Sequence, residues 1–463
     1  MSRLAKLLMF AKKFGGGGGN VEPLVVTENG EYNAKENIDG YAPVIIAVPK
    51  SDVTDPADAA KALIDNFGSA EYCFARKLNE EDLLKCLRYD ITENATSVAY
   101  MFHGCNNLQT LPVLNLSKVK SARGSAVGGV DYMFQNCTAL KEVPPLNILH
   151  LENIRYTFDY CLNLEFPDWI TEYEGIFFGT FKFCNFINGL KNKTFKCKEA
   201  ANLFMNGLYN IDVENVHFPF SQSCNSIFRE TYAAKFSNIT IGGDCSYAFY
   251  KTNATEISNL NITNLSSNAR ISSLFGYCKK LTTVTISKIE TIDNSMFGLT
   301  SIFEYCDALV DAPYIDLKNC NYFHYVFQAC KALKTIPAYD FRNVTNLGGF
   351  VVNCTSLEEI NVKNISANLE IGNGTKYGTN ITTESLIHVI YECRINTGSA
   401  LKVSSASLQK LASIYVKLVP VTDEMRAEDD LVDEKLPFVV CESTDEGAML
   451  ITDYAAEKNW SVW

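Results

Sequence analysis

A short motif, Phe-x-x-Cys-x-x-Leu, recurs along much of this chain of 463 residues and constrains its fold more than any other feature. Its clearest copies comprise Phe102, Cys105 and Leu108; Phe134, Cys137 and Leu140; Phe158, Cys161 and Leu164; Phe275, Cys278 and Leu281; Phe303, Cys306 and Leu309; and Phe327, Cys330 and Leu333. Cys354 and Leu357 keep the frame, with Val351 in place of the phenylalanine. Between the two groups, Phe181, Phe204, Phe228 and Phe249 hold the same register with degraded motifs. The period is about 24 residues, which is typical of a repeat solenoid.

A short apolar stretch follows several of these motifs, and each stretch predicts one short strand per turn. These stretches cover residues 111–116, 143–148, 284–286, 336–341 and 360–362. One unit alone cannot bury its apolar face, so the turns must stack and their Phe, Cys and Leu side chains must share a continuous core. We expect a mainly β repeat solenoid with short helical turns and a leucine-rich-repeat parallel sheet, together with a small β N-terminal module and α-containing caps.

The chain has 16 cysteines, most of them at the repeat interval. It contains no Cys-x-x-Cys pair, so the spacing indicates neither a zinc site nor a disulfide framework. We expect one small buried free thiol per turn, in a tight corner of the core. The alternative is a stacked thiol ladder that binds a soft metal, but a linear ladder lacks converging tetrahedral ligands. No cofactor is expected.

These patterns divide the chain into five regions. Residues 1–20 form a basic and apolar arm with a glycine tether, residues 21–50 a small β attachment module, and residues 51–99 a helical cap whose two helices start near Asp55 and Asn79. Residues 100–371 carry the repeats. Residues 372–463 form a C-terminal cap with an insertion at 419–449, whose acidic part, residues 423–434, is expected to be a solvated loop.

The N-terminal arm presents apolar side chains that we expect to be buried in an assembly: Leu4, Leu7, Leu8, Phe10 and Phe14. Its apolar centre is too short for a signal peptide, so we expect a product without classical secretion. No apolar run reaches the ~18 residues of a membrane span. The formal net charge of −12 argues against nucleic acid as a partner, because neutralising phosphates requires a basic face.

No residue pattern typical of an enzyme is present, and we expect no catalysis. The five histidines are scattered, and His103 and His324 are expected to lie on repeat surfaces rather than to act as bases. No repeated pattern places acids such as Glu304 and Asp316 together, so they would meet in a groove only if the stacking of the turns happened to align them. Glycan cleavage by paired carboxylates is therefore kept only as a second alternative.

The repeat resembles the BspA-like leucine-rich-repeat family, whose repeats carry Met-Phe-x-x-Cys-x-x-Leu followed by a strand. The resemblance is clearest at Met101-Phe102 and Met133-Phe134 and extends over roughly residues 100–371. It implies a surface-exposed adhesion or interaction module. Between Phe181 and Phe249 the pattern weakens, and Gly207 replaces one of the cysteines.

Both ends of the chain resemble segments of bacteriophage proteins. The first resemblance, to a small module of phage tail and other virion proteins, rests on Thr27, Asn29, Gly30, Tyr32, Gly40 and Tyr41. The second, to the terminal cap of phage-borne repeats of this type, rests on the Ala-x-x-Lys-x-Trp pattern that ends with Lys458 and Trp460. The insertion at 419–449 departs from that pattern.

The resemblances favour a non-enzymatic phage virion protein, located in the virion after synthesis in the host bacterial cytoplasm, as a head or tail fibre or decoration protein. It would contact other virion proteins through the N-terminal arm and bind a host cell-surface protein or glycan through the solenoid. A homo-oligomer, as a trimer, is the expected assembly. The alternatives are a bacterial cell-surface adhesin and a glycan-degrading tail protein.

Overall fold

The structure is a computed structural model that describes residues 56–71, 73–75, 80–121, 127–186, 189–292, 295–374, 380–394, 399–429 and 437–462. The chain divides into two compact units, Met1–Asp212 and Val213–Trp463, and each is considered by itself. The arm residues, the β module at 21–50, Asp55 and Asn79 lie outside the described residues, so the predictions made for them stay predictions.

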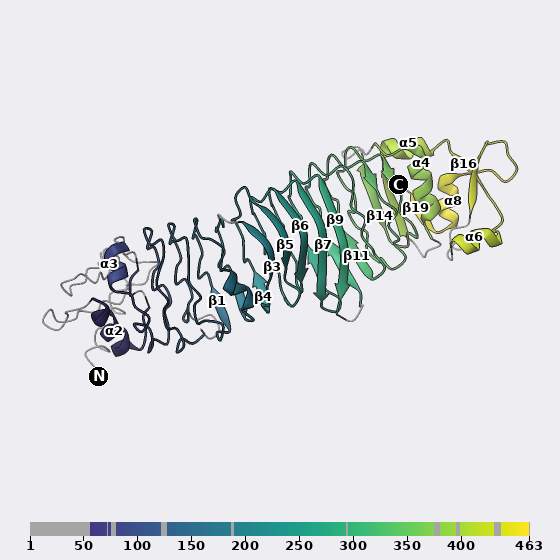
Figure 1. Cartoon of the computed structure of the whole chain (residues 1–463). Helices are drawn as coiled ribbons and strands as arrows, with labels where there is room; N and C mark the ends of the chain where they lie inside the picture. Colours follow the sequence, from purple (N-terminus) through teal and green to yellow (C-terminus); the bar gives the residue numbers. More distant parts are fainter. Residues whose placement is uncertain are drawn as a thin grey trace, which may run out of the picture. The chain divides into compact units, whose positions relative to one another are not determined.

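Two helices open the described part of the first unit, α2 (Pro56–Phe67) and α3 (Glu80–Lys85) (Figure 1). Proline suits the first turn of α2, because the N–H group that it lacks would have no partner there. Ala60 and Ile64 lie one helical turn apart and are fully buried, as is Leu83 of α3. The two helices predicted for the N-terminal cap are thus present.

The rest of the first unit is a coil whose turns pair in parallel. Strands β1 (Asn153–Arg155), β2 (Ile176–Phe178) and β4 (Glu199–Ala201) form one sheet in that order. Ile154 pairs with Phe177, and Phe177 pairs with Ala200, so equivalent residues of successive turns lie in one row. Along the chain, a 3₁₀ helix, η1 (Asp168–Glu172), lies between β1 and β2, and a strand, β3 (Leu190–Thr194), lies between β2 and β4.

One side of the second unit is a parallel sheet. It contains β5 (Asp212–His217), β6 (Lys235–Gly242), β7 (Glu256–Leu265) and β9 (Thr283–Thr291), side by side in that order (Figure 1). Its buried residues recur at intervals of three and two positions, as at Phe236, Ile239 and Ile241 of β6. Ile239 pairs with Leu260, for example, and both side chains are fully buried.

Shorter sheets complete the turns of the second unit. Strands β8 (Arg270–Ser272), β10 (Phe297–Thr300) and β11 (Cys320–His324) pair in parallel, with β10 in the middle. β12 (Thr335–Ile336) pairs in parallel with β13 (Glu359–Ile360). Both units are therefore stacks of parallel turns around an apolar interior, and the predicted parallel β-solenoid is confirmed.

The predicted position of the strands was partly wrong. Residues 111–116 and 143–148 form no strand, and β9 contains the predicted stretch 284–286. β12 and β13 overlap the stretches 336–341 and 360–362 by one residue each, and β12 ends directly before Pro337. Proline explains this difference, because Pro112, Pro144 and Pro145 have no N–H group to donate to a neighbouring turn. The regular strands of the first unit instead lie just before the core phenylalanines, where β1 ends at Arg155 and is followed by Phe158.

The C-terminal cap combines helices with one more parallel sheet. Its elements are β14 (Leu369–Gly374), α4 (Thr383–Glu392), β15 (Ser399–Ser404), α5 (Ser405–Leu411), α8 (Ile451–Glu457) and β19 (Trp460–Val462). The sheet order is β14-β15-β19. The fully buried Lys458 donates from Nζ to the carbonyl oxygen of Tyr391 at 3.1 Å, and Trp460 donates from Nε1 to that of Arg394 at 2.7 Å. The Lys-x-Trp pattern therefore ties the last strand to the end of α4.

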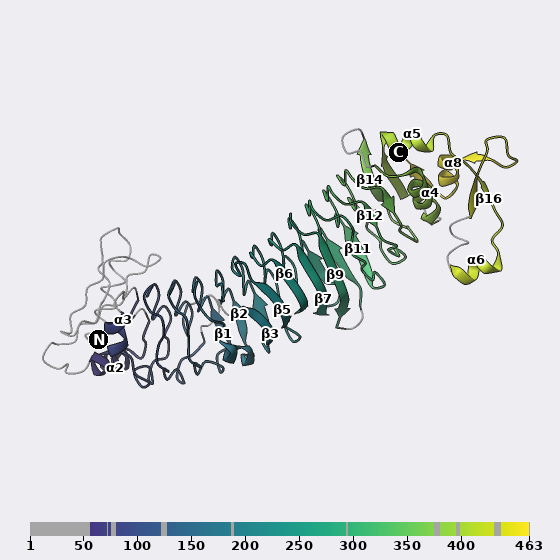
Figure 2. The ribbon, with the colours of Figure 1, turned by 45° about the horizontal axis from the view of Figure 1, so that its top comes forward.

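The insertion contributes β17 (Phe438–Cys441) and the first residue of β18 (Met449–Leu450) to an antiparallel sheet. The middle strand of this sheet, β16 (Tyr415–Leu418), comes just before the insertion. A short helix, α6 (Asp423–Glu428), lies to one side of this sheet (Figure 2). The prediction of a loop across 423–434 was therefore wrong at its start. The Thr422 side chain caps α6 by accepting a hydrogen bond from the Met425 N–H, and no residue of α6 is buried.

Candidate functional site

The repeat residues singled out in the sequence form the interior of the turns. Each of them is at most 1% exposed. In the first unit the rings of Phe102, Phe134 and Phe158 are stacked, with centroids 5.3 and 5.4 Å apart. In the second unit Phe303 stacks in the same way between Phe275 and Phe327, at 5.0 and 5.2 Å. These residues stabilise the solenoid and cannot reach a ligand.

Each motif cysteine has a second role that its spacing did not show. The Cys137 thiol donates to the carbonyl oxygen of Phe102 at 3.0 Å, and Cys330 donates likewise to Phe303 at 2.9 Å. The same bond recurs at Cys105, Cys161, Cys184, Cys278, Cys306 and Cys354. All sixteen cysteines are free, and all but Cys441 are buried. Burial raises the pKa of the Cys137 thiol well above its usual value, so it stays protonated and can donate.

The backbone around each core phenylalanine has a left-handed residue two positions before and two positions after it. The φ angles at these positions lie between 49° and 70°. In one turn the residues are Tyr132 and Asn136; their N–H groups donate to the carbonyls of Arg155 and Asp159 in the next turn. A left-handed residue other than glycine costs roughly 1–2 kcal/mol, and here hydrogen bonds between turns offset that cost.

Aromatic residues occupy many of these left-handed positions, two residues before or two residues after a core phenylalanine, and their exposure ranges from 7% at Tyr100 to 39% at Tyr325. We call them the tyrosine edge. In the first unit it consists of Tyr100, Tyr132, Tyr156, Tyr160 and Phe183. The first three are stacked, with centroids 4.7 and 5.0 Å apart, and Tyr160 lies 4.0 Å from Phe183. Tyr160 is 38% exposed, so at least part of the row is open to a partner.

In the second unit the tyrosine edge consists of Tyr247, Tyr250, Tyr277, Tyr305 and Tyr325. All of them except Tyr250 have left-handed backbone angles, and Tyr250 directly follows Phe249. Tyr277 stacks on Tyr305 with centroids 4.6 Å apart, and Tyr250 lies 5.5 Å from Tyr277. Tyr247 and Tyr325 are 38% and 39% exposed. Rigid, half-exposed tyrosines give a large contact area at a low cost in side-chain entropy, which suits recognition.

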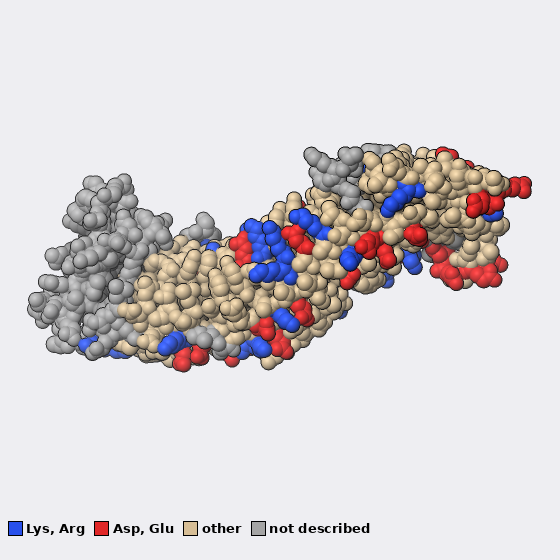
Figure 3. Space-filling model, turned by 90° about the horizontal axis from the view of Figure 1, so that it is seen from above, with Lys and Arg blue, Asp and Glu red and all other residues tan. Residues whose placement is uncertain are grey.

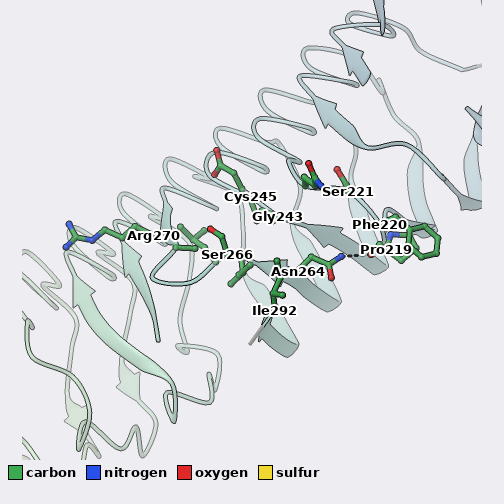
Figure 4. Close-up of a pocket in the computed structure, with 14 residues that line it drawn as sticks. Pro219, Phe220, Ser221, Gly243, Cys245, Asn264, Ser266, Arg270 and Ile292 are labelled. Carbon is green, nitrogen blue, oxygen red and sulfur yellow. Dashed lines mark hydrogen bonds between the residues drawn. The ribbon is translucent and has the colours of Figure 1, made fainter. Parts of the chain in front are cut away.

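A pocket of about 830 Å³ opens at the corner that follows β5, β6, β7 and β9 (Figure 4). Phe220 and Ile292, which line it, are 67% and 66% exposed. Asn264 crosses the corner and donates from Nδ2 to the carbonyl oxygen of Pro219 at 2.5 Å. The guanidinium of Arg270 lies 4.3 Å from the ring centroid of Tyr322. The lining mixes apolar residues with polar ones such as Gln222 and Asp244, and the pocket offers a second surface for binding.

Two carboxylates of the first unit are buried beside the tyrosine edge. Burial is the main cause that raises the pKa of Asp131 and of Asp159 to about 6. Asp131 accepts from the Arg155 N–H at 3.1 Å, and Asp159 accepts from Gln135 Nε2 at 2.9 Å. These bonds position the carboxylates within the fold, away from any open cleft.

The histidine prediction was half wrong. His103 is buried, at 4% exposed, and its ring meets the Tyr100 ring edge-on at 5.7 Å. His324 is half-buried, and burial lowers its pKa. Glu304 lies next to the tyrosine edge, whereas Asp316 accepts a hydrogen bond from the N–H of Lys318 in its own turn.

Among the residues that the structure describes, no three His, Cys, Asp or Glu side chains gather as metal ligands would. In the same part of the chain, no helix combines the length and the apolarity needed to cross a membrane. The surfaces that the structure does offer are the tyrosine edge and the pocket at the corner. Two sequence patterns marked the edge, Tyr-Met-Phe at Tyr100 and Tyr132 and Phe-x-Tyr-Cys at Tyr160, Tyr277 and Tyr305, and the core roles of Phe and Cys masked both.

Comparisons with known proteins add little about function. Residues 243–365 match a family model described as "Mycoplasma protein of unknown function, DUF285". No curated protein matches the chain. Among solved structures, the chain is similar to a leucine-rich repeat protein from Bacteroides ovatus ATCC 8483, with 15% identity over 70% of this chain and 80% of that chain and a TM-score of 0.26. We therefore base the fold assignment on the turns of this chain themselves.

Proposed function

We propose that this chain is a non-enzymatic binding protein, whose solenoid recognises a protein or glycan on a bacterial surface through its tyrosine edge. The observation that carries the proposal is the row of Tyr250, Tyr277 and Tyr305 from three successive turns. Beside it stand the exposed Tyr247 and Tyr325, which hold the same position in two turns that are not adjacent. Aromatic side chains held in place by their neighbours are the residues that most often dominate binding energy at interfaces. An extended row of them suits a partner that is itself extended.

We further propose that the protein is a structural component of a phage particle, as a head or tail fibre or decoration protein. The support is the resemblance of residues 27–41 to a virion module and of the segment ending at Lys458 and Trp460 to a phage-borne cap. In this proposal the arm at residues 1–20 attaches to other virion proteins and assembles the chain as a homo-oligomer, with the trimer as the expected state. The solenoid would then carry the recognition surface.

Binding to host cells tests the recognition step. Fluorescently labelled full-length protein is mixed with candidate host bacteria, and bound protein is measured by flow cytometry. The double variant Tyr247→Ser/Tyr325→Ser should bind at least about tenfold more weakly, since two aromatic contacts are lost. Tyr415→Ser, a half-exposed tyrosine of β16, is the matched control and should bind like the unaltered chain. Equal binding by both variants would refute recognition through the tyrosine edge.

Location is tested separately, by electron microscopy of phage particles labelled with an antibody against the C-terminal cap. Label on the head or the tail is the expected result. Label on the envelope of bacteria that carry no phage would instead favour the bacterial cell-surface adhesin. Release of sugar fragments from a capsule preparation by the purified protein would favour the glycan-degrading tail protein.

A further inference from the structure

A second, smaller pocket lies against the tyrosine edge of the second unit, and basic side chains surround it. Its volume is about 380 Å³. The pocket at the corner after β5, β6, β7 and β9 has a volume of about 830 Å³, which is larger by about 450 Å³. The lining of the smaller pocket consists of Lys251, Thr252, Asn253, Tyr277, Lys279 and Lys280. We call it the basic pocket. The residues belong to two successive turns, just after Phe249 and Phe275, so the stacking of the turns brings them together.

The tyrosines beside the basic pocket are held by cations. The guanidinium of Arg229 lies 5.2 Å from the Tyr250 ring centroid, and Lys251 Nζ lies 5.3 Å from the same centroid. Tyr277 packs between Tyr250 and Tyr305. Cations over aromatic rings stabilise both partners, so the rings and the charges are held close together before any ligand arrives.

The positive charge here exceeds the negative charge. Glu230 contacts both Arg229, at 3.3 Å, and Lys251, at 4.0 Å. Within the described residues, the side chains of Lys279, Lys280 and Asn253 take part in no hydrogen bond or ion pair. Glu304, half-buried near Tyr277, and Asp307, which pairs with Lys331 at 3.6 Å, are further acids close to the edge. Figure 3 shows that Lys and Arg side chains do gather in one patch on the face it displays.

Such a patch is unusual in a chain whose formal net charge is −12, and it points to an anionic ligand. We infer that the basic pocket binds a carboxylated polysaccharide, with the lysines facing carboxylates and the tyrosine rings packing against the sugar rings. This inference rests on the proposed function and names the chemistry of its ligand. Nucleic acid fits less well, because its dense charge, about one per 1.7 Å of duplex, would be repelled by the acidic remainder of the protein.

Binding of the full chain to immobilised alginate, a polymer of uronic acids, tests the inference. Dextran of similar length is the neutral control, and a single-stranded oligonucleotide tests nucleic acid. We expect alginate to bind, dextran to bind at least tenfold more weakly, and alginate binding to weaken as salt is raised, since screening reduces charge attraction. Tighter binding of the oligonucleotide, or equal binding of dextran and alginate, would overturn the inference.

Charge reversal locates the site. Lys279→Glu/Lys280→Glu should lose at least about tenfold in affinity for alginate, because two attractive charges become repulsive. Lys331→Glu/Lys363→Glu makes the same change in net charge at exposed positions of other turns and should lose much less. Similar losses in the two variants would show that net charge, rather than this pocket, governs binding. If alginate fails while the chain still binds host cells, only the inference fails; if host cells are not bound at all, the proposed function fails.

Discussion

The residue that follows a core phenylalanine is covered by its neighbours to different extents in different turns. Successive turns place His103, Gln135 and Asp159 there, and the first and third are buried although all three are polar. A hydrogen bond from Gln135 to Asp159 joins two neighbouring turns. Burying a polar group costs free energy unless it is hydrogen-bonded, so these contacts between turns are needed where the solenoid covers polar residues.

A pH dependence follows from Asp159. Its pKa is raised to about 6 in the folded chain, chiefly by burial, from an ordinary value of 3.8. The folded state therefore holds the proton more tightly than the unfolded state, so this group favours folding below about pH 4 and loses that contribution as the pH rises through about 6. Asp159→Asn should raise the free energy of unfolding by roughly 1–3 kcal/mol at pH 8 and by much less at pH 4.

Urea denaturation of the Asp159→Asn variant at the two pH values measures this effect. Asp212→Asn, at an exposed position, is the control and should change stability little at either pH. A variant that is less stable than the parent at pH 8 would show that the Asp159 carboxylate stabilises the fold, against the expectation.

Among the elements, the corner after β6 depends on glycine for two separate reasons. Gly243 has a φ of +65°, and a Cβ atom at this position would overlap the carbonyl oxygen of Gln222 in the preceding turn. Gly447, before β18, has a similar φ of +78° but no atom within 4 Å of a Cβ. The two glycines therefore share the backbone strain and differ in the steric contact.

We expect Gly447→Ala to cost about 1 kcal/mol, the strain of a left-handed alanine. Gly243→Ala should cost a further ~1–3 kcal/mol, because the turn must move away from its neighbour. Denaturation midpoints in urea, at equal slopes, provide the comparison. Equal losses would mean that the turns yield easily at this corner, and that close stacking contributes little to its stability.

Strands β5, β6 and β7 share another feature, which the sequence analysis did not predict. Asn215, Asn238 and Asn259 interrupt β5, β6 and β7 with φ angles between 52° and 54°. Their side-chain amides hydrogen-bond in a row, from Asn238 to Asn215 at 2.7 Å and from Asn259 to Asn238 at 2.9 Å. Asparagine tolerates the left-handed region better than most residues, and the amide row supports it there.

For the molecule as a whole, repetition makes one turn exchangeable for another. Phe275 stacks on Phe303, and Phe303 stacks on Phe327, at almost the same distance. Deleting residues 303–326 removes one turn and places Phe327 against Phe275 in the position that Phe303 held. Because each repeat contacts only its neighbours, this shortened chain should fold, with a modest loss of stability.

Deletion of residues 303–314 is the contrasting variant, since it removes half a turn and brings unlike residues into the core rows. We expect it to be largely unfolded by circular dichroism and to be degraded rapidly by a protease, while the whole-turn deletion resembles the parent in both assays. Equal damage from the two deletions would contradict the independence of the turns.

By itself the sequence determined the interior of this protein: a period of about 24 residues, with Phe, Cys and Leu at fixed spacing, forces turns to stack around those side chains. It also indicated the cap helices α2 and α3, because capping and proline preferences act locally. Only the tertiary structure decided where strands form, since a strand needs a donor and an acceptor on a neighbouring turn, and that pairing joins residues about 24 positions apart in the chain. The tyrosine edge and the basic pocket depend on left-handed backbone angles that hydrogen bonds between turns maintain, and such bonds join residues far apart in the chain.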